Sequence, residues 1–140
     1  KDKFNIDLTL AKLAVSRGIS HEHFKDFVDP KIKNLLPDPL VLHDMQKATD
    51  RVIQSIQERS KIGILGDYDV DGSSATALLC NYFEDIKVQY EYYIPDRLKE
   101  GYGPNPEALE KLKEKNCQLI LTLDCGTTSV SSINHIKKKE

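Results

Sequence analysis

Three aspartates at alternate positions, Asp67, Asp69 and Asp71, follow a short apolar stretch and precede Gly72. Like charges a few ångströms apart repel and raise one another's pKa values, so such a cluster is costly unless a cation neutralises it. Carboxylate oxygens suit hard divalent ions such as Mg²⁺ and Mn²⁺. A fourth carboxylate, Asp124, follows a later apolar stretch. Four converging carboxylates indicate a two-metal site, which can activate a water and stabilise a phosphoryl transition state.

The segments around these aspartates alternate between predicted strands and predicted helices. Short apolar runs predict the strands, and amphipathic or alanine-rich stretches predict the helices. The strands are expected at residues 61–65, 87–94 and 118–123, and the helices at 73–84, 106–115 and 129–138. This alternation is typical of an α/β fold with a doubly wound, mainly parallel sheet, whose ligand sites lie at the carboxyl ends of the strands. We therefore expect the two acidic segments to meet at that edge.

The first 59 residues predict a helical lead-in to this sheet. Helices are expected over residues 7–17 and 20–27, capped by Asp7 and Ser20, and over residues 43–59. Residues 29–39 contain three prolines and are expected to be loop with at most one turn. The expected domain division is therefore a lead-in over residues 1–59 and an α/β domain over residues 60–140.

Other interpretations of the acidic turn are less favoured. An EF-hand needs a bidentate acid at the twelfth loop position, which is Leu78 here, and a helix before the loop, where a strand is predicted. A haloacid-dehalogenase-like phosphatase has a similar Asp-x-Asp-Gly motif, but its nucleophile directly follows a strand, and here residues 66–68 intervene. An acidic surface turn without function would not explain why a second predicted strand also ends in an aspartate, in the sequence Asp-Cys-Gly at Asp124.

Two motifs resemble those of the DHH phosphoesterase superfamily. Residues 66–72, GDYDVDG, look like its first motif, and residues 119–126, LILTLDCG, look like its second. Residues 94–105 and the lead-in around residues 36–39 and 43–48 are similar to the RecJ family of exonucleases within it. The resemblance keeps one order over nearly the whole chain.

This resemblance implies a hydrolase that degrades single-stranded DNA from 5′ to 3′ in DNA repair and recombination. Asp67, Asp69, Asp71 and Asp124 would bind Mn²⁺ or Mg²⁺, and Asp69, Asp71 and Asp124 would be catalytic, with Asp124 bridging two ions. The Asp-His-His motif that names the superfamily lies beyond residue 140, and His135 does not replace it. We therefore expect these residues to be inactive alone. The alternatives are a phosphodiesterase for oligonucleotides or cyclic dinucleotides, or a catalytically dead binding module.

Four further residues are candidate substrate contacts. Arg97 could meet a phosphate and Tyr102 could stack on a base, with Asn105 on the same glycine-containing loop. Ser73 opens a predicted helix, where backbone amides can face an anion. A solvated loop and simple helix capping are the alternative interpretations. The expected partners are single-stranded DNA and, from the family, a single-strand-binding protein and a helicase.

The composition limits the protein class. The net charge is −2, so any charge that grips a nucleic acid must be local or lie outside these residues. No apolar run approaches the roughly 20 residues of a membrane span. The cysteines Cys80, Cys117 and Cys125 lack CxxC spacing, which favours a reducing, cytoplasmic setting without disulfides or zinc. His21 and His23 do not share a helix face, so they are expected to lie on a surface helix.

Overall fold

The structure of the chain is a computed structural model that describes residues 6–137. It contains two compact units, Lys1–Met45 and Gln46–Glu140. Among the described residues, no helix combines the length and the apolar character that crossing a bilayer requires.

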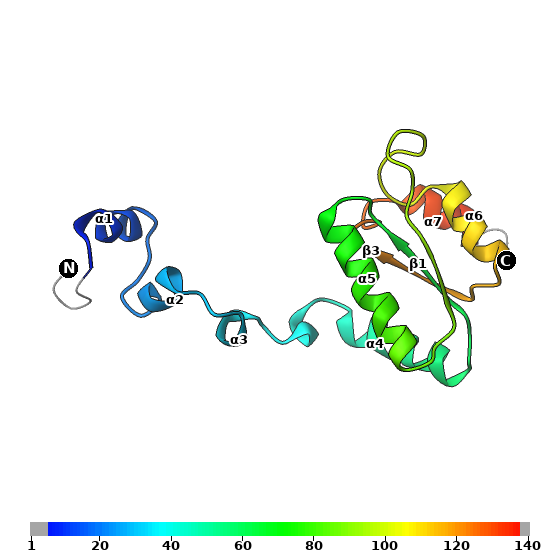
Figure 1. Cartoon of the computed structure of the whole chain (residues 1–140), viewed down its shortest axis with the longest axis horizontal. Coiled ribbons are helices and arrows are strands. Elements are labelled where there is room, and N and C mark those ends of the chain that lie inside the picture. Colours follow the sequence, from blue (N-terminus) through cyan, green and yellow to red (C-terminus); the bar gives the residue numbers. More distant parts are fainter. Residues whose placement is uncertain (1–5, 138–140) are drawn as a thin grey trace. The chain divides into compact units, whose positions relative to one another are not determined.

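The first unit consists of short helices joined by loops (Figure 1). They are α1 (Leu8–Ser16), α2 (Phe24–Val28), α3 (Ile32–Leu35) and the 3-10 helix η1 (Pro39–Val41). The Asp7 carboxylate caps α1 by accepting a hydrogen bond from the Thr9 amide at 2.7 Å, as predicted. The second helix, α2, begins at Phe24, later than predicted, and the Ser20 hydroxyl contacts His23 Nδ1 at 2.8 Å in the turn before it.

The second unit is an α/β domain built on a three-stranded parallel sheet with the strand order β2-β1-β3. After α4 (Met45–Gln57), strands β1 (Ile62–Gly66), β2 (Tyr90–Tyr93) and β3 (Leu119–Leu123) alternate with α5 (Val70–Asp85), α6 (Pro106–Glu114) and α7 (Val130–Lys137). Figure 1 shows α5 on one face of the sheet and α6 with α7 on the other. The predicted α/β class with a parallel sheet is confirmed.

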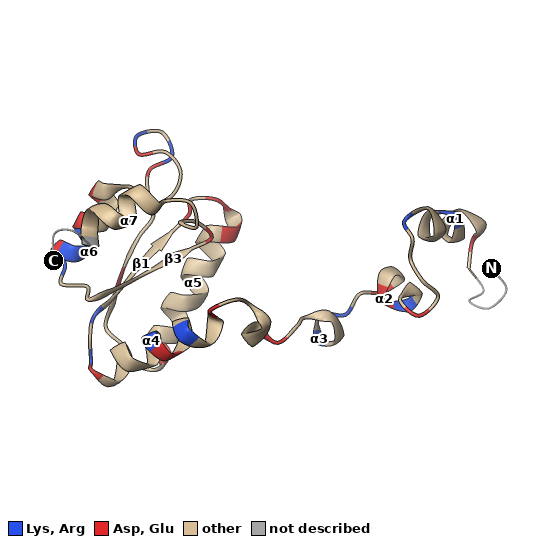
Figure 2. Cartoon of the chain, turned by 180° about the vertical axis from the view of Figure 1, so that it is seen from behind, with Lys and Arg blue, Asp and Glu red and all other residues tan. Residues whose placement is uncertain are grey.

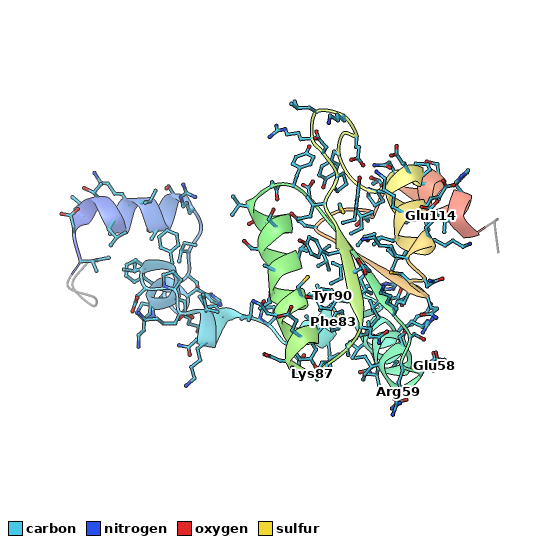
Figure 3. The ribbon with its side chains drawn as sticks, turned by 45° about the vertical axis from the view of Figure 1, so that its right-hand side comes forward. Glu58, Arg59, Phe83, Lys87, Tyr90 and Glu114 are labelled. Atoms are coloured by element: carbon cyan, nitrogen blue, oxygen red, sulfur yellow. The ribbon has the colours of Figure 1, made fainter. Side chains whose placement is uncertain are left out.

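The central strand β1 is buried along its whole length because helices cover both of its faces. Ile62 and Ile64 pack with Phe83 of α5 in one core cluster. The Phe83 ring also lies 6.0 Å from the ring of Tyr90, with which it is labelled in Figure 3. Leu65 belongs to a second cluster with buried residues of α6 and with Cys117. This rigid central strand ends directly at the acidic turn.

Charged residues of both signs lie at this end of the sheet, as they do elsewhere on the chain. Figure 2 shows acidic residues in red at the start of α5 and basic residues in blue on the loop between β2 and α6. That loop contains Arg97 and Lys99, both exposed. Two basic residues thus lie on the loop that packs against the acidic turn.

Candidate metal centre

The acidic turn begins with Asp67, whose side chain is 2% exposed immediately after β1. Its close neighbour is Gly72, in the first turn of α5. A Cβ atom at position 72 would lie 2.5 Å from Asp67 Cβ, 2.6 Å from its carbonyl oxygen and 2.7 Å from its Cα. The approach of the helix to the turn therefore requires glycine at position 72.

The second aspartate, Asp69, is the N-cap of α5. Its Oδ1 accepts a hydrogen bond from the Gly72 amide at 2.9 Å. The helix thus begins at Val70, three positions before the predicted start at Ser73. Ser73 lies inside the helix, and its amide donates to the Asp69 carbonyl oxygen at 2.9 Å. The Ser73 amide is therefore engaged in the helix instead of facing outward.

Asp124, the fourth of the predicted acidic residues, reaches the site through the register of the sheet. Gly66 of β1 pairs with Leu123 of β3, so the residues that follow each strand lie side by side. Asp124 adopts a left-handed backbone conformation with φ of 58°. Its carbonyl oxygen accepts a hydrogen bond from the Tyr102 hydroxyl at 3.0 Å. The bond holds the backbone of this residue against the loop between β2 and α6.

These three aspartates converge. Asp67, Asp69 and Asp124 each offer a carboxylate oxygen, and the three oxygens lie within 4.8 Å of one another. Asp71 is exposed in the first turn of α5 and does not belong to this group. It still acts electrostatically, because the pKa of Asp124 is raised by burial and then by the charges of Asp69, Asp71 and Asp67. The carboxylates of the site therefore repel one another, and a cation would relieve that repulsion.

The residues present fit a divalent cation. Asp67 Oδ1 is buried and has no hydrogen-bond partner within residues 6–137. A buried carboxylate oxygen without a partner is unfavourable unless a cation or donor satisfies it. Three carboxylates form an all-oxygen ligand set, which suits hard ions such as Mg²⁺ and Mn²⁺. The cluster could hold such an ion.

The loop between β2 and α6 packs against the acidic turn through aromatic rings. The Arg97 guanidinium carbon lies 5.3 Å from the centroid of the Tyr68 ring. Tyr102 meets the same ring edge-on, with centroids 6.3 Å apart at an interplanar angle of 81°. Burial, followed by the charges of Asp67 and Asp124, raises the pKa of Tyr102, which favours the protonated hydroxyl.

An open depression lies beside these groups. It has a volume of about 450 Å³. The residues that line it come from the loop and from the end of β3: Tyr102, Thr122, Asp124, Cys125, Gly126, Thr127 and Thr128. Two of the predicted site residues, Tyr102 and Asp124, thus share one concave surface.

The other end of the loop is fixed by Glu100, which sequence reasoning missed. Its carboxylate accepts hydrogen bonds from the Tyr93 hydroxyl at 2.7 and 2.8 Å and from the Asp96 amide at 3.1 Å. Asn105 caps α6 by accepting from the Ala108 amide at 2.8 Å, and its own amide lies 3.5 Å from Glu100. The side chain of Asn105 therefore already has structural partners. The sequence Asn105-Pro106 could have predicted this cap, because Asn is favoured at the N-cap and Pro at the first helical position.

His135 and the three cysteines are not members of the acidic group. His135 pairs with Glu110 at 3.3 Å. Cys80, Cys117 and Cys125 are free thiols. Burial and then the charge of Asp67 raise the pKa of Cys125, which disfavours its thiolate beside the acidic cluster.

Comparisons with known proteins identify the family of this chain. The model of the DHH family, N-terminal domain, matches residues 61–140. The single-stranded-DNA-specific exonuclease RecJ of Bacillus subtilis (strain 168) is 38% identical over 130 residues, covering 92% of this chain and 16% of that protein. The exonuclease of the same name from Escherichia coli (strain K12) is 29% identical over 129 residues, covering 91% of this chain and 22% of that protein.

Two solved structures resemble this one. A crystal structure of exonuclease RecJ bound to manganese matches with a TM-score of 0.63 and 29% identity, over 69% of this chain and 25% of that chain. RecJ from Thermus thermophilus in complex with Mn²⁺ has the same fold, with a TM-score of 0.67 and 22% identity over 92% of this chain and 17% of that chain. The chain thus spans a quarter or less of the length of these proteins. It belongs to the DHH family, and the relatives that it resembles are RecJ exonucleases.

Proposed function

We propose that this chain is the metal-binding front part of an exonuclease that hydrolyses phosphodiester bonds of single-stranded DNA from 5′ to 3′. The observation that carries the proposal is the convergence of Asp67, Asp69 and Asp124 around a buried carboxylate oxygen without a partner. Membership of the DHH family and the names of the RecJ relatives support the same conclusion. The proposed division is a helical lead-in over residues 1–59 and the first part of the DHH domain over residues 60–140.

In this proposal, Asp67, Asp69, Asp71 and Asp124 would hold two Mn²⁺ or Mg²⁺ ions. Such ions, when bound, supply the Lewis acidity that activates water and neutralises charge at the scissile phosphate. The Asp69 carboxylate is fixed before metal binding by its cap on α5, and the backbone of Asp124 is held by the hydrogen bond from Tyr102 to its carbonyl oxygen. Residues 1–140 contain no Asp-His-His sequence, and we propose that cleavage also requires the histidines of that family motif.

The substrate contacts are proposed on the loop beside the cluster. Arg97 would bind a backbone phosphate, and Tyr102 would stack on a base at the depression next to Asp124. Ser73 and Asn105 enter as secondary contacts, because a helix turn already engages the Ser73 amide and a helix cap engages the Asn105 side chain. Because the net charge of the chain is −2, contacts with the DNA backbone would depend on such local basic residues.

The wider setting is proposed from the family alone. It is DNA repair and recombination in the cytoplasm, with a single-strand-binding protein and a helicase as partners. These partners have no identified docking surface among the described residues, so the tests concern the metal and the DNA.

The first test is thermal unfolding of the chain with increasing Mn²⁺. We expect the midpoint to rise, and to stay constant in Asp124→Asn and Asp69→Asn. Asp85→Asn is the matched control, since Asp85 is an exposed carboxylate at the opposite end of α5. A wild-type protein without any metal-linked shift would contradict the metal centre and favour a binding module.

The second test uses the complete gene product and end-labelled single-stranded DNA. We expect Mn²⁺-dependent release of nucleotides from the 5′ end, and no release by Asp124→Asn. Retained cleavage in that variant would refute the role of Asp124. Activity confined to short oligonucleotides or cyclic dinucleotides would instead identify another phosphodiesterase of the family.

A further inference from the structure

Tyr68 lies between two members of the acidic cluster, Asp67 and Asp69, and its side chain is half-buried. The proposed metal ligands and substrate contacts do not include it. Nevertheless, Tyr68 is the point at which the acidic turn touches the loop between β2 and α6, since Arg97 and Tyr102 of that loop both pack on its ring.

The contact with Arg97 is a cation–π interaction. The 5.3 Å separation between the guanidinium carbon and the ring centroid falls within the roughly 6 Å limit for such contacts. Within residues 6–137, the guanidinium has no ion pair or hydrogen bond, so the ring is what orients it. The guanidinium therefore keeps all of its hydrogen-bond donors available.

The contact with Tyr102 extends the arrangement to the cluster itself. The two rings meet edge to face, a favourable geometry for aromatic pairs. The Tyr102 hydroxyl then donates to the carbonyl oxygen of Asp124. A continuous series of contacts thus runs from Arg97 through the two rings to the backbone of Asp124.

We propose that Tyr68 is a positioning residue, which holds Arg97 and Tyr102 beside the acidic cluster so that a single strand of DNA meets both at once. This deepens the proposed function and rests on it for the identity of the ligand. The ring carries the role, because the Tyr68 hydroxyl has no hydrogen bond within residues 6–137. Phenylalanine at this position should therefore suffice, whereas leucine should not.

The first experiment needs no nucleic acid. Trypsin cuts after Arg97 and Lys99, both exposed on the loop, and the rate of cutting rises as the loop becomes more mobile. Losing a cation–π contact and an aromatic pair should raise the rate of these cuts roughly fivefold to twentyfold in Tyr68→Leu. Tyr68→Phe should match the wild type, and so should the control Tyr82→Leu, which removes an exposed tyrosine from α5.

The second experiment measures binding of a fluorescein-labelled oligothymidylate to the complete gene product without divalent cations. We expect Tyr68→Leu to weaken binding roughly threefold to tenfold, a loss that Tyr68→Phe restores. Because part of this loss acts through Arg97, the losses in the double variant Tyr68→Leu/Arg97→Ala should be less than additive. Tyr68→Leu should keep its Mn²⁺-linked rise in melting temperature, because the carboxylates remain.

The outcomes separate this proposal from the function on which it rests. Equal trypsin rates in Tyr68→Leu and the wild type would overturn the positioning role, and so would additive losses in the double variant. A wild-type protein that does not bind the oligonucleotide would overturn the proposed function. The trypsin rates would then still decide whether Tyr68 positions the loop.

Discussion

Replacing Gly72 by alanine tests whether the acidic turn is as tightly built as the structure indicates. The added Cβ would lie 2.5–2.7 Å from three atoms of Asp67, two of which belong to its backbone. Favourable carbon contacts begin near roughly 3.5 Å, so Asp67 or the start of α5 must move by up to about 1 Å. Asp67 carries the buried carboxylate of the cluster, so this movement reaches the metal site directly.

The expected size of the effect follows from two opposing contributions. Forcing an extra methyl into a packed site costs about 1–3 kcal/mol. Alanine is better than glycine in a helix by up to about 1 kcal/mol, which offsets part of that cost. We expect a net loss near 1–2 kcal/mol, or about 3–10 °C in melting temperature for a chain of this size. The control Ser74→Ala, an exposed position on the same helix, should not lower the melting temperature.

The decisive assay is thermal unfolding with and without Mn²⁺. At a hundredfold excess over its Kd, a ligand stabilises the folded state by about 2.7 kcal/mol. Ligand distances tolerate only about 0.2 Å, so Gly72→Ala should lose most of this stabilisation while Ser74→Ala keeps it. A Gly72→Ala protein with wild-type stability and a full Mn²⁺ response would refute both the close contact and its importance for the site.

Two further predictions concern single carboxylates. Asp67→Asn removes one of the like charges near Asp69 and Asp124. Without metal, we therefore expect its melting temperature to equal or exceed that of the wild type, and we expect the Mn²⁺ response to be lost. A lower metal-free melting temperature would contradict the repulsion between the carboxylates. The pKa of Glu100 is lowered, chiefly by the hydrogen bond from the Tyr93 hydroxyl. A carboxylate whose pKa falls on folding stabilises the protein above its unfolded pKa, and that stability is lost as the pH falls through the folded pKa. Glu100→Gln should therefore unfold with a weaker dependence on acidic pH, measured as melting temperature against pH, and an unchanged acid dependence would exclude this role.

The convergence of the acidic residues could be predicted from the sequence because parallel strands end at one edge of a sheet. Placing Asp67 and Asp124 after two apolar strands was enough to bring them together. The position of Asp71 could not be predicted in the same way. Sequence reasoning started α5 at Ser73, whereas Asp69 caps the helix and places Asp71 on its exposed first turn. Because the Asp69 side chain can act as a helix cap or as a metal ligand, the sequence alone does not show where α5 begins.

The contacts of the loop between β2 and α6 could not be predicted from local sequence patterns. Tyr68 and Arg97 are far apart in the sequence, and no spacing rule indicates that their side chains stack. Glu100 resembled an ordinary charged loop residue, although it accepts hydrogen bonds from Tyr93 and Asp96. Such roles depend on tertiary packing, which only the folded chain reveals.

The cap that Asp69 forms on α5 has a consequence for how mutants at this position are interpreted. Alanine there removes a cluster carboxylate and also a helix cap, which is worth about 1 kcal/mol. Asparagine removes the charge but keeps an oxygen that can accept from the Gly72 amide. An alanine scan would therefore mix lost folding with lost chemistry, and the Asn variant is the one that separates them. By the same reasoning, a descendant of this protein that abandoned metal chemistry would be free to lose Asp124 but would be expected to keep Asn, Ser or Thr at position 69.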